Sequence, residues 1–315
     1  MPDADAEAIR RGNRDVLPRH VAWRAHVAIV AAAVLFGTTF VVVKDAVDEV
    51  EPVPFLAVRF LLGGLVLLPL AVRRPGGAGE TRAGLWCGLS LLTGYVLQTV
   101  GLQYTTASVS AFITYLLVVI VPVISAVVLR RPPTAPTVVG VVVGTAGLFL
   151  LTGKGLALGR GEVLTLGCAV AFAAHIVLLA AFAPRFDVLR LNAAQLLVTG
   201  AACLVPGLFL GGYRFTAEAW LAAAYTAVAV SALALGLQLW GQRHVGPTRT
   251  SLLLMIEPVA AAVLGYVTGE RLGLRGVIGA AVILVGIVVA EAPLLRRASP
   301  GGRKHNGPAG PCTAR

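Results

Sequence analysis

Charged residues are scarce in this chain of 315 residues, since Asp, Glu, Lys and Arg together make up only 13% of it. A water-soluble protein of this size needs a polar surface, and so few charges do not supply one. Hydrophobic residues account for 57% of the sequence. The composition therefore predicts that lipid rather than water surrounds most of the chain.

Motifs for metal, nucleotide and covalent chemistry are also lacking. Of the four cysteines, Cys87, Cys168 and Cys203 fall in apolar runs and Cys312 in a polar tail. They form no CxxC or Cys/His spacing, which disfavours a disulfide framework and a metal site. The GxxxxGK[ST] phosphate loop, the GxSxG nucleophile turn and the HExxH zinc motif are absent as well. We therefore expect no metal, no cofactor, no enzyme activity and no ATP hydrolysis by this chain itself.

The net charge of +11 does not indicate a nucleic-acid partner, because the basic residues are scattered between apolar runs. Residues 1–24 are polar and rich in arginine, with no short apolar core and cleavage site close behind. This pattern favours a cytoplasmic tail over a secretory signal. Residues 294–315 are rich in Gly, Pro and Arg, and they predict a second cytoplasmic tail.

Between the tails the sequence alternates apolar segments with short polar breaks. Because a helix rises about 1.5 Å per residue, about 20 apolar residues cross the hydrocarbon core of a bilayer. The pattern predicts an all-α integral membrane protein with ten transmembrane helices. They are expected at residues 25–45, 53–72, 84–103, 107–129, 136–152, 162–183, 191–211, 218–241, 248–268 and 275–293.

Lys and Arg residues predict the orientation of these segments, because cytoplasmic loops carry an excess of them. With the N-terminus inside, the tails and the cytoplasmic loops hold far more Lys and Arg than the opposite loops. The reverse orientation would invert this bias. We expect a multi-pass protein of the cytoplasmic (inner) membrane with both termini in the cytoplasm.

The second half of the sequence resembles the first when the two are superposed. One alignment of the halves pairs Leu61 with Leu197 and Gly64 with Gly200. After a short gap, the same order of segments pairs Gly140 with Gly279 and Gly147 with Gly286. Chance matching in a chain rich in Ala, Val and Gly is the alternative explanation.

If the repeat is real, two five-helix units at 25–152 and 160–293 are joined by a loop at 153–159. A unit with an odd number of spans forces its second copy into the membrane upside down. Inverted repeats are typical of secondary transporters, whose halves open a central site to each side in turn.

Four stretches resemble the EamA branch of the drug/metabolite transporter superfamily, over roughly residues 25–293. They are Phe36 to Lys44, Arg59-Phe60, Pro247 to Leu254 followed by Glu257-Pro258, and Gly269 to Leu272. The resemblance implies a fold of two five-helix halves with a central cavity. It also implies transport of amino acids, related metabolites or drugs, often as efflux. One departure is that Val118-Val119 stands where Glu257-Pro258 sits in the other half.

Three ionisable residues inside the apolar segments are candidates for substrate binding or coupling. A charge at the bilayer centre costs about 2.5–3.5 kcal/mol on insertion scales, so such groups face a cavity or a partner. Glu257 is interpreted as a proton or cationic-substrate site, or as a carboxyl group hydrogen-bonded where a proline frees a carbonyl. His175 could relay protons or bind an anion, or it is a packed histidine with one satisfied nitrogen. Arg59 could hold a substrate carboxylate, or it reaches the outer surface or pairs with Glu51.

Neutral polar and aromatic residues recur at helical spacing on the third, fourth and eighth segments. They could line a mostly apolar cavity with a few directed hydrogen-bonding groups. Interhelical hydrogen bonding and interfacial anchoring are the alternatives. The candidates are Tyr95, Gln98, Thr114, Tyr115, Gln238 and Trp240.

Small residues at four-residue spacing let helix backbones approach closely. We assign such glycines to helix packing, either within the chain or at a contact between two copies in a homodimer. These are Gly140, Gly144, Gly147, Gly279 and Gly286.

The prediction is therefore a secondary transporter for small molecules in the lipid bilayer, with protons as the candidate coupling ion. A lipid or lipid-carrier flippase of the same architecture is the main alternative. An intramembrane enzyme or a channel fits the sequence less well.

Overall fold

The computed structural model describes residues 19–105, 107–130, 132–152, 159–267 and 273–298. Within these ranges the regular structure is helical, with no strand. This confirms the all-α prediction for the described part of the chain. The tails up to residue 18 and from residue 299, the connecting residues 153–158 and the motif at 269–272 lie outside it.

Each predicted apolar segment coincides with one helix or with a run of consecutive helices. The first half contains α2 (Arg19–Glu49), α3 (Pro52–Ala71), α4 (Glu80–Leu102), α5 (Ala107–Tyr115), α6 (Leu117–Val128) and α7 (Ala135–Thr152). The second half contains α8 (Arg160–Phe182), α9 (Val188–Phe209), α10 (Ala217–Tyr225), the π-helix η2 (Thr226–Ala234), α11 (Leu235–Val245), α12 (Pro247–Leu253), α13 (Ile256–Val267) and α14 (Leu274–Ala298).

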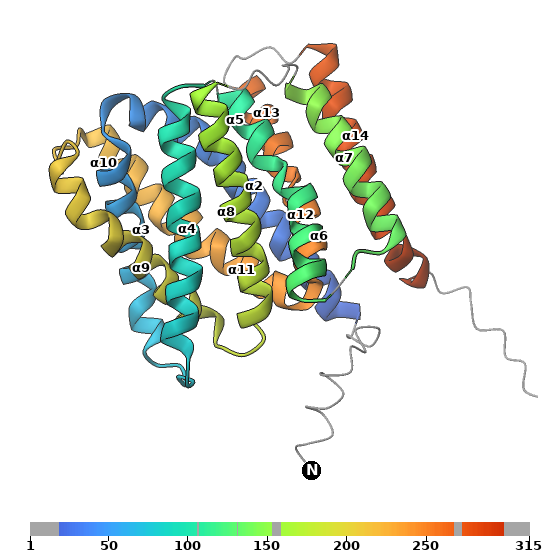
Figure 1. Cartoon of the computed structure of the whole chain (residues 1–315), viewed down its shortest axis with the longest axis horizontal. Helices are drawn as coiled ribbons and strands as arrows, with labels where there is room; N and C mark the ends of the chain where they lie inside the picture. The colour runs from blue at the N-terminus through green and yellow to red at the C-terminus, as the bar shows by residue number, and fades with distance from the viewer. Residues whose placement is uncertain (1–18, 106, 131, 153–158, 268–272, 299–315) are drawn as a thin grey trace, which may run out of the picture.

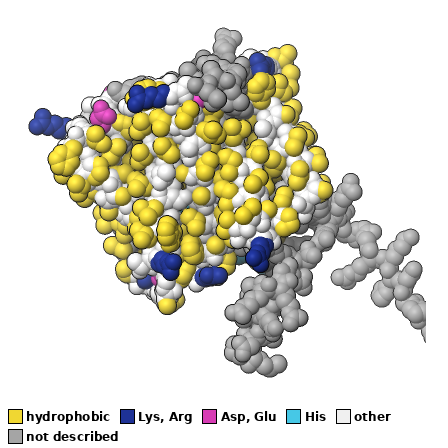
Figure 2. Space-filling model, in the orientation of Figure 1, with side chains coloured by type: hydrophobic (Ala, Val, Ile, Leu, Met, Phe, Trp, Pro, Cys, Tyr) yellow, Lys and Arg dark blue, Asp and Glu magenta, His cyan; other side chains and the backbone are white. Residues whose placement is uncertain are grey.

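Helix length and composition fit a membrane environment. Among the described residues, 7 helical stretches are long and apolar enough to cross a membrane. Shorter apolar helices cover Ile113–Val128, Ala135–Leu151 and Leu274–Ala290. Figure 2 shows hydrophobic side chains across the middle of the molecule, with the Lys and Arg side chains at its two ends. An apolar outer surface of this kind is stable in lipid rather than in water.

Local sequence signals set several helix starts. Pro52 and Pro247 occupy the first positions of α3 and α12. Proline suits this place because an N–H there would have no partner inside the helix. Asp187 caps α9 by accepting hydrogen bonds from two backbone N–H groups, and Thr216 caps α10 through one.

Two of the predicted spans are broken near their middle. The α5 and α6 helices meet at Leu116, and α12 and α13 meet at Leu254 and Met255. Glu257 and Pro258 stand in the first turn of α13. Because an N–H in the first turn has no partner inside the helix, a proline costs little there, and Pro258 favours a new helix start at this point. The ninth predicted span is therefore two helices rather than one continuous helix.

The α3 and α9 helices pack closely along one another. A Cβ atom added to Gly64 would lie 2.7 Å from Cγ of Leu197, and one added to Gly200 would lie 2.7 Å from Cγ of Leu61. Rising residue numbers on α3 therefore meet falling numbers on α9. The two helices are antiparallel, and glycine allows their backbones to approach.

The α7 and α14 helices form a second close antiparallel pair, at the edge of the bundle in Figure 1. A Cβ atom added to Gly147 would lie 2.6 Å from the backbone nitrogen of Ile283, and one added to Gly286 would lie 2.7 Å from that of Gly144. The glycines expected to pack helices all lie on this pair: Gly140, Gly144, Gly147, Gly279 and Gly286. All of them except Gly144 face the partner helix within the chain, whereas a Cβ atom added to Gly144 would lie 2.9 Å from Sδ of Met255.

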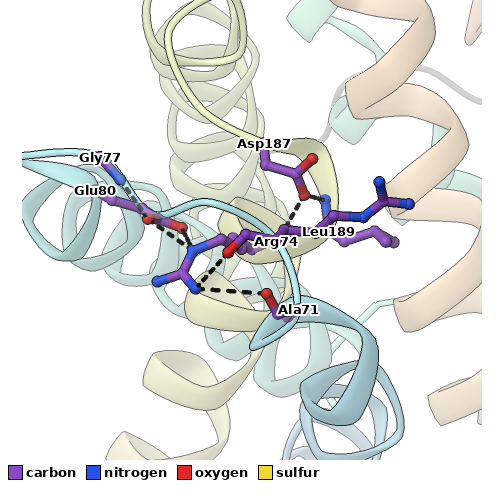
Figure 3. Close-up of polar contacts among 7 residues, drawn as sticks. Ala71, Arg74, Gly77, Glu80, Asp187 and Leu189 are labelled. Atoms are coloured by element: carbon purple, nitrogen blue, oxygen red, sulfur yellow. Dashed lines mark hydrogen bonds and ion pairs between the residues drawn. The ribbon is translucent and has the colours of Figure 1, made fainter.

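A polar cluster joins the ends of α3, α4 and α9 (Figure 3). The Arg190 side chain donates from Nε to both carboxylate oxygens of Glu80, at 2.7 and 2.8 Å. Its Nη1 donates to the backbone carbonyls of Ala71 and Arg74, at 3.4 and 3.3 Å. We call these contacts of Arg190 the clamp. Because only 8% of the Glu80 side chain is exposed, the pair is less screened than a surface ion pair.

Candidate functional site

A cavity of about 110 Å³ lies among α2, α3, α4, α5, α8, α11 and the start of α13. Since a water molecule needs about 10–15 Å³ of such space, the cavity has room for several. Both halves of the chain contribute to its wall. All of the predicted binding or coupling residues except Trp240 line it: Arg59, Tyr95, Gln98, Thr114, Tyr115, His175, Gln238 and Glu257.

Arg59 is held inside the bundle by neutral partners. Only 2% of the Arg59 residue is exposed, so it does not reach the surface. It also does not pair with Glu51, which lies exposed just before the first residue of α3. Its Nε donates to the Ser231 hydroxyl group at 3.0 Å, and its Nη2 donates to the Tyr95 hydroxyl group at 3.3 Å. A guanidinium group has five N–H donors, so two bonds leave capacity for a ligand.

Aromatic rings surround the Arg59 guanidinium group. Its central carbon lies 4.8 Å from the ring centroid of Tyr95 and 5.1 Å from that of Phe60. The Tyr95 ring also meets Phe60 and Phe172 edge-on, with centroid distances of 4.9 and 5.1 Å. Cation–π contacts partly replace the lost hydration of a buried cation. They also fix the plane of the guanidinium group.

Glu257, in the broken ninth span, supplies a carboxyl group to the cavity wall. The Tyr115 hydroxyl group is a hydrogen-bond partner of its carboxyl group, and Arg59 interacts with it electrostatically. Its backbone carbonyl lies close to α2, because a Cβ atom added to Gly37 would be 2.8 Å from that oxygen. Val118, which occupies the corresponding place in the first half, is fully buried in the core. The site therefore has one such carboxyl group rather than two.

Amide and hydroxyl groups from three predicted segments meet at the same cavity. Gln98 donates from Nε2 to the Thr114 hydroxyl group at 3.3 Å. Gln238 donates from Nε2 to the side-chain oxygen of Gln242 at 3.4 Å. The geometry therefore brings together residues that only helical spacing had suggested.

His175 lies on the α8 side of the cavity and is 3% exposed. Its Nε2 is 2.9 Å from the side-chain oxygen of Gln195. Gln195 and its neighbour Asn192 are fully buried, and neither is among the residues predicted from the sequence. The signal was available, since two amides three residues apart in an apolar span repeat the pattern that singled out Gln98.

Trp240 lies outside the cavity wall, unlike the other candidates. Its ring packs beside His244 at a centroid distance of 5.1 Å. His244 Nδ1 is 2.9 Å from the Trp240 carbonyl oxygen, so the two residues form a local pair on one helix. Trp240 is therefore not part of the cavity wall, and its contact with a ligand stays a prediction.

No group of three or more His, Cys, Asp or Glu side chains is placed to hold a metal ion among the described residues. The polar groups of the cavity are instead one guanidinium, one carboxyl, one imidazole and several amide and hydroxyl groups. Such a set binds small polar molecules through hydrogen bonds and charge.

Comparison with known proteins agrees with this architecture. The sequence profile of the EamA-like transporter family matches residues 23–153 and again residues 159–291. A solved crystal structure superposes with a TM-score of 0.75 at 20% identity, covering 87% of this chain and 99% of the other. That likeness concerns the fold.

Several proteins with similar sequences are named as transporters. An uncharacterized transporter of Archaeoglobus fulgidus is 28% identical over 279 residues, covering 85% of each chain. The uncharacterized transporter YoaV of Bacillus subtilis is 24% identical and covers 85% of this chain and 97% of its own. The uncharacterized inner membrane transporter YedA of Escherichia coli is 26% identical over 280 residues, covering 82% of this chain and 89% of its own.

The helices and the polar cavity define a multi-pass membrane protein whose two halves both line one internal cavity. With two successive matches that cover most of its length, the chain belongs to the EamA-like transporter family. It is a membrane transporter rather than an enzyme, as the names of its relatives also indicate.

Proposed function

We propose that this chain is a secondary transporter that moves small metabolites across the cytoplasmic membrane by alternating access, in the direction of efflux. The observation that carries the proposal is the cavity, which both halves of the chain line and which holds Arg59 and Glu257 in its wall. A central site at the seam of two repeats can be opened to one side and then to the other.

An inverted repeat is supported by the way corresponding helices pack. The alignment of the halves pairs Gly64 with Gly200 and Leu61 with Leu197. If the halves are related by symmetry, a contact between Gly64 and Leu197 predicts an equivalent contact between Gly200 and Leu61. Both contacts are present. The family profile matches each half separately. Because the corresponding helices α3 and α9 are antiparallel, the two halves are related as upside-down copies.

The broken helices support the same relation. In the alignment that pairs Gly140 with Gly279, α6 and α13 begin and end at corresponding residues. The break at Leu116 then corresponds to the break at Met255. Discontinuous helices at corresponding places are typical of the binding site in transporters with inverted repeats. In Figure 1 the start of α2 and the end of α14 lie at the same end of the bundle, which supports ten crossings with both termini in the cytoplasm.

The position of the cavity favours a state closed at the clamp. The α4 helix begins at Glu80 in the clamp, and it lines the cavity only from Leu91 to Leu102. With the termini inside, the clamp lies at the cytoplasmic end. The opposite conformation then requires the ends of α3, α4 and α9 to separate.

The chemistry of the cavity favours small molecules with both an anionic and a cationic group, such as amino acids and related compounds. Arg59 offers donors to an anionic group, and Glu257 offers acceptors to an ammonium group or a proton. Aromatic and aliphatic residues of the wall leave room for an apolar side chain. Drugs with the same groups fit the same description.

Glu257→Gln tests proton coupling. Because glutamine keeps the shape but cannot bind a proton, we expect it to abolish transport driven by a pH gradient. The measurement is uptake of a panel of labelled amino acids and small amines by proteoliposomes. Glu218→Gln, which alters an exposed carboxyl group in the first turn of α10, serves as the matched control.

Unchanged transport with an unchanged pH profile would remove Glu257 from the mechanism. Translocation of a fluorescent phospholipid in the same vesicles, with no uptake from the panel, would favour the flippase alternative.

A further inference from the structure

A chain of hydrogen bonds runs behind the cavity wall and joins two of its ionisable residues. From His175 it passes to Gln195 at 2.9 Å and from Gln195 Nε2 to Asn192 Oδ1 at 2.8 Å. Asn192 Nδ2 donates to the backbone carbonyls of Ala232 and Ser231, at 2.9 and 3.5 Å. From the other side, Arg59 donates to the Ser231 hydroxyl group. The bonds that lead from His175 and the bond from Arg59 therefore both reach the π-helix η2.

The π-helix explains why carbonyl groups are available at this point. In η2 the backbone N–H groups bond five residues back, as Leu235 does to the Val230 carbonyl. In α11 they bond four residues back, as Gly246 does to the Gln242 carbonyl at its end. Where the register shortens by one, a carbonyl is left without an N–H partner. An unpaired carbonyl inside a membrane is costly, so the Asn192 side chain is needed there.

The direction of every bond in the chain follows from these carbonyls. A backbone carbonyl only accepts, so the NH₂ group of Asn192 must face it and the Asn192 oxygen must face Gln195. That oxygen also only accepts, so Gln195 turns its NH₂ group to Asn192 and its oxygen to His175. The His175 nitrogen that meets this oxygen must then carry a proton.

We infer that Asn192 and Gln195 are positioning residues, which fix the proton of His175 on Nε2 and, through η2, the place of the Ser231 hydroxyl group that orients Arg59. A neutral imidazole with its proton on Nε2 has a lone pair on Nδ1. His175 is then a hydrogen-bond acceptor toward the cavity, whereas Arg59 is a donor.

Ligand selection follows if the chain transports small molecules as proposed above. The wall prefers a molecule that offers an N–H or O–H donor to His175 and an acceptor to Arg59. A molecule with acceptors alone would leave the Nδ1 lone pair facing another lone pair, which is unfavourable.

The test is a nitrogen-15 NMR spectrum of histidine-labelled protein in lipid nanodiscs, with the His175 signals assigned from the spectrum of His175→Phe. No ligand or transport activity is needed, so its outcome is independent of the proposed function. In the wild-type protein we expect a protonated Nε2 with a slowly exchanging proton and an unprotonated Nδ1.

Two variants interrupt the chain of hydrogen bonds, one next to His175 and one further from it. Gln195→Met removes the acceptor, and the slowly exchanging proton signal should be lost. Asn192→Leu does not touch His175 directly but frees the Gln195 amide to turn over, so a second tautomer with the proton on Nδ1 should appear. Thr199→Val is the matched control, because Thr199 is fully buried on the same helix and bonds only backbone carbonyls. Its spectrum should match that of the wild type.

A wild-type His175 with its proton on Nδ1, or doubly protonated at neutral pH, would overturn the inference even if no variant folds. A folded Asn192→Leu protein with a single, unchanged tautomer would show that Asn192 does not position the proton of His175.

Discussion

At the residue scale, Arg59 is placed by groups that neutralise none of its charge. Ser231 and Tyr95 accept its hydrogen bonds, and two aromatic rings flank it. Nearby, Glu257 supplies the only carboxyl group among the described residues of the cavity wall. The proposed binding of an anionic ligand group to Arg59 rests on this arrangement.

Arg59→Lys tests that arrangement. Lysine keeps the charge, but its single ammonium nitrogen cannot occupy the places of both Nε and Nη2, which bond Ser231 and Tyr95. Since a charged hydrogen bond contributes about 1.5–3 kcal/mol, we expect substrate binding to weaken roughly ten- to a hundredfold. The measurement is the concentration dependence of uptake in proteoliposomes. Arg82→Lys, at an exposed position near the start of α4, should leave it unchanged.

At the element scale, the bundle depends on close backbone contacts between corresponding helices. The α7–α14 pair is the clearest case, because the two helices make most of their packing contacts with each other. Their glycines leave no space for side chains at the crossing. Van der Waals packing of this kind drives helix association in lipid, where the hydrophobic effect contributes little between helices.

Gly286→Ala should therefore lower the thermal stability of the protein in detergent. The new Cβ atom would lie 2.7 Å from the backbone nitrogen of Gly144, so one helix has to move. Overpacking costs about 1–3 kcal/mol in well-packed cores. Gly273→Ala is the matched control, since nothing lies within 4 Å of its added Cβ. Equal melting temperatures for the two variants would contradict this account of the pair.

At the scale of the whole molecule, the clamp and the cavity lie toward opposite ends of α4. The Arg190 contacts tie together segments far apart in the sequence, and beyond them Cys87 is fully buried against Leu179 and Leu191. The alternating access proposed above requires this end to open. Under that proposal, the clamp is one of the contacts that must break.

Arg190→Gln should raise the rate at which a water-soluble maleimide modifies Cys87, in a protein with the other three cysteines replaced by alanine. The loss of the charged hydrogen bonds to Glu80 destabilises the closed end relative to the open one. Modification followed by mass spectrometry gives the rate. Arg185→Gln, at an exposed residue of the preceding turn, provides the control. A rate no different from the control would show that the clamp does not hold this end closed.

The sequence by itself determined the helical class, the approximate limits of the apolar segments and most of the residues that meet in the cavity. Apolar runs have few stable conformations in lipid, and polar groups inside them have few places to go. Glu257, Arg59 and His175 could therefore be recognised without a structure.

Only the tertiary structure decided which partners these residues have. The bonds from Arg59 to Ser231 and from Asn192 to the carbonyls of η2 join segments far apart in the sequence or depend on a local change of helix register. It also placed Trp240 outside the cavity wall. Helical spacing defines a face of one helix, but which neighbour that face meets depends on how all the helices pack.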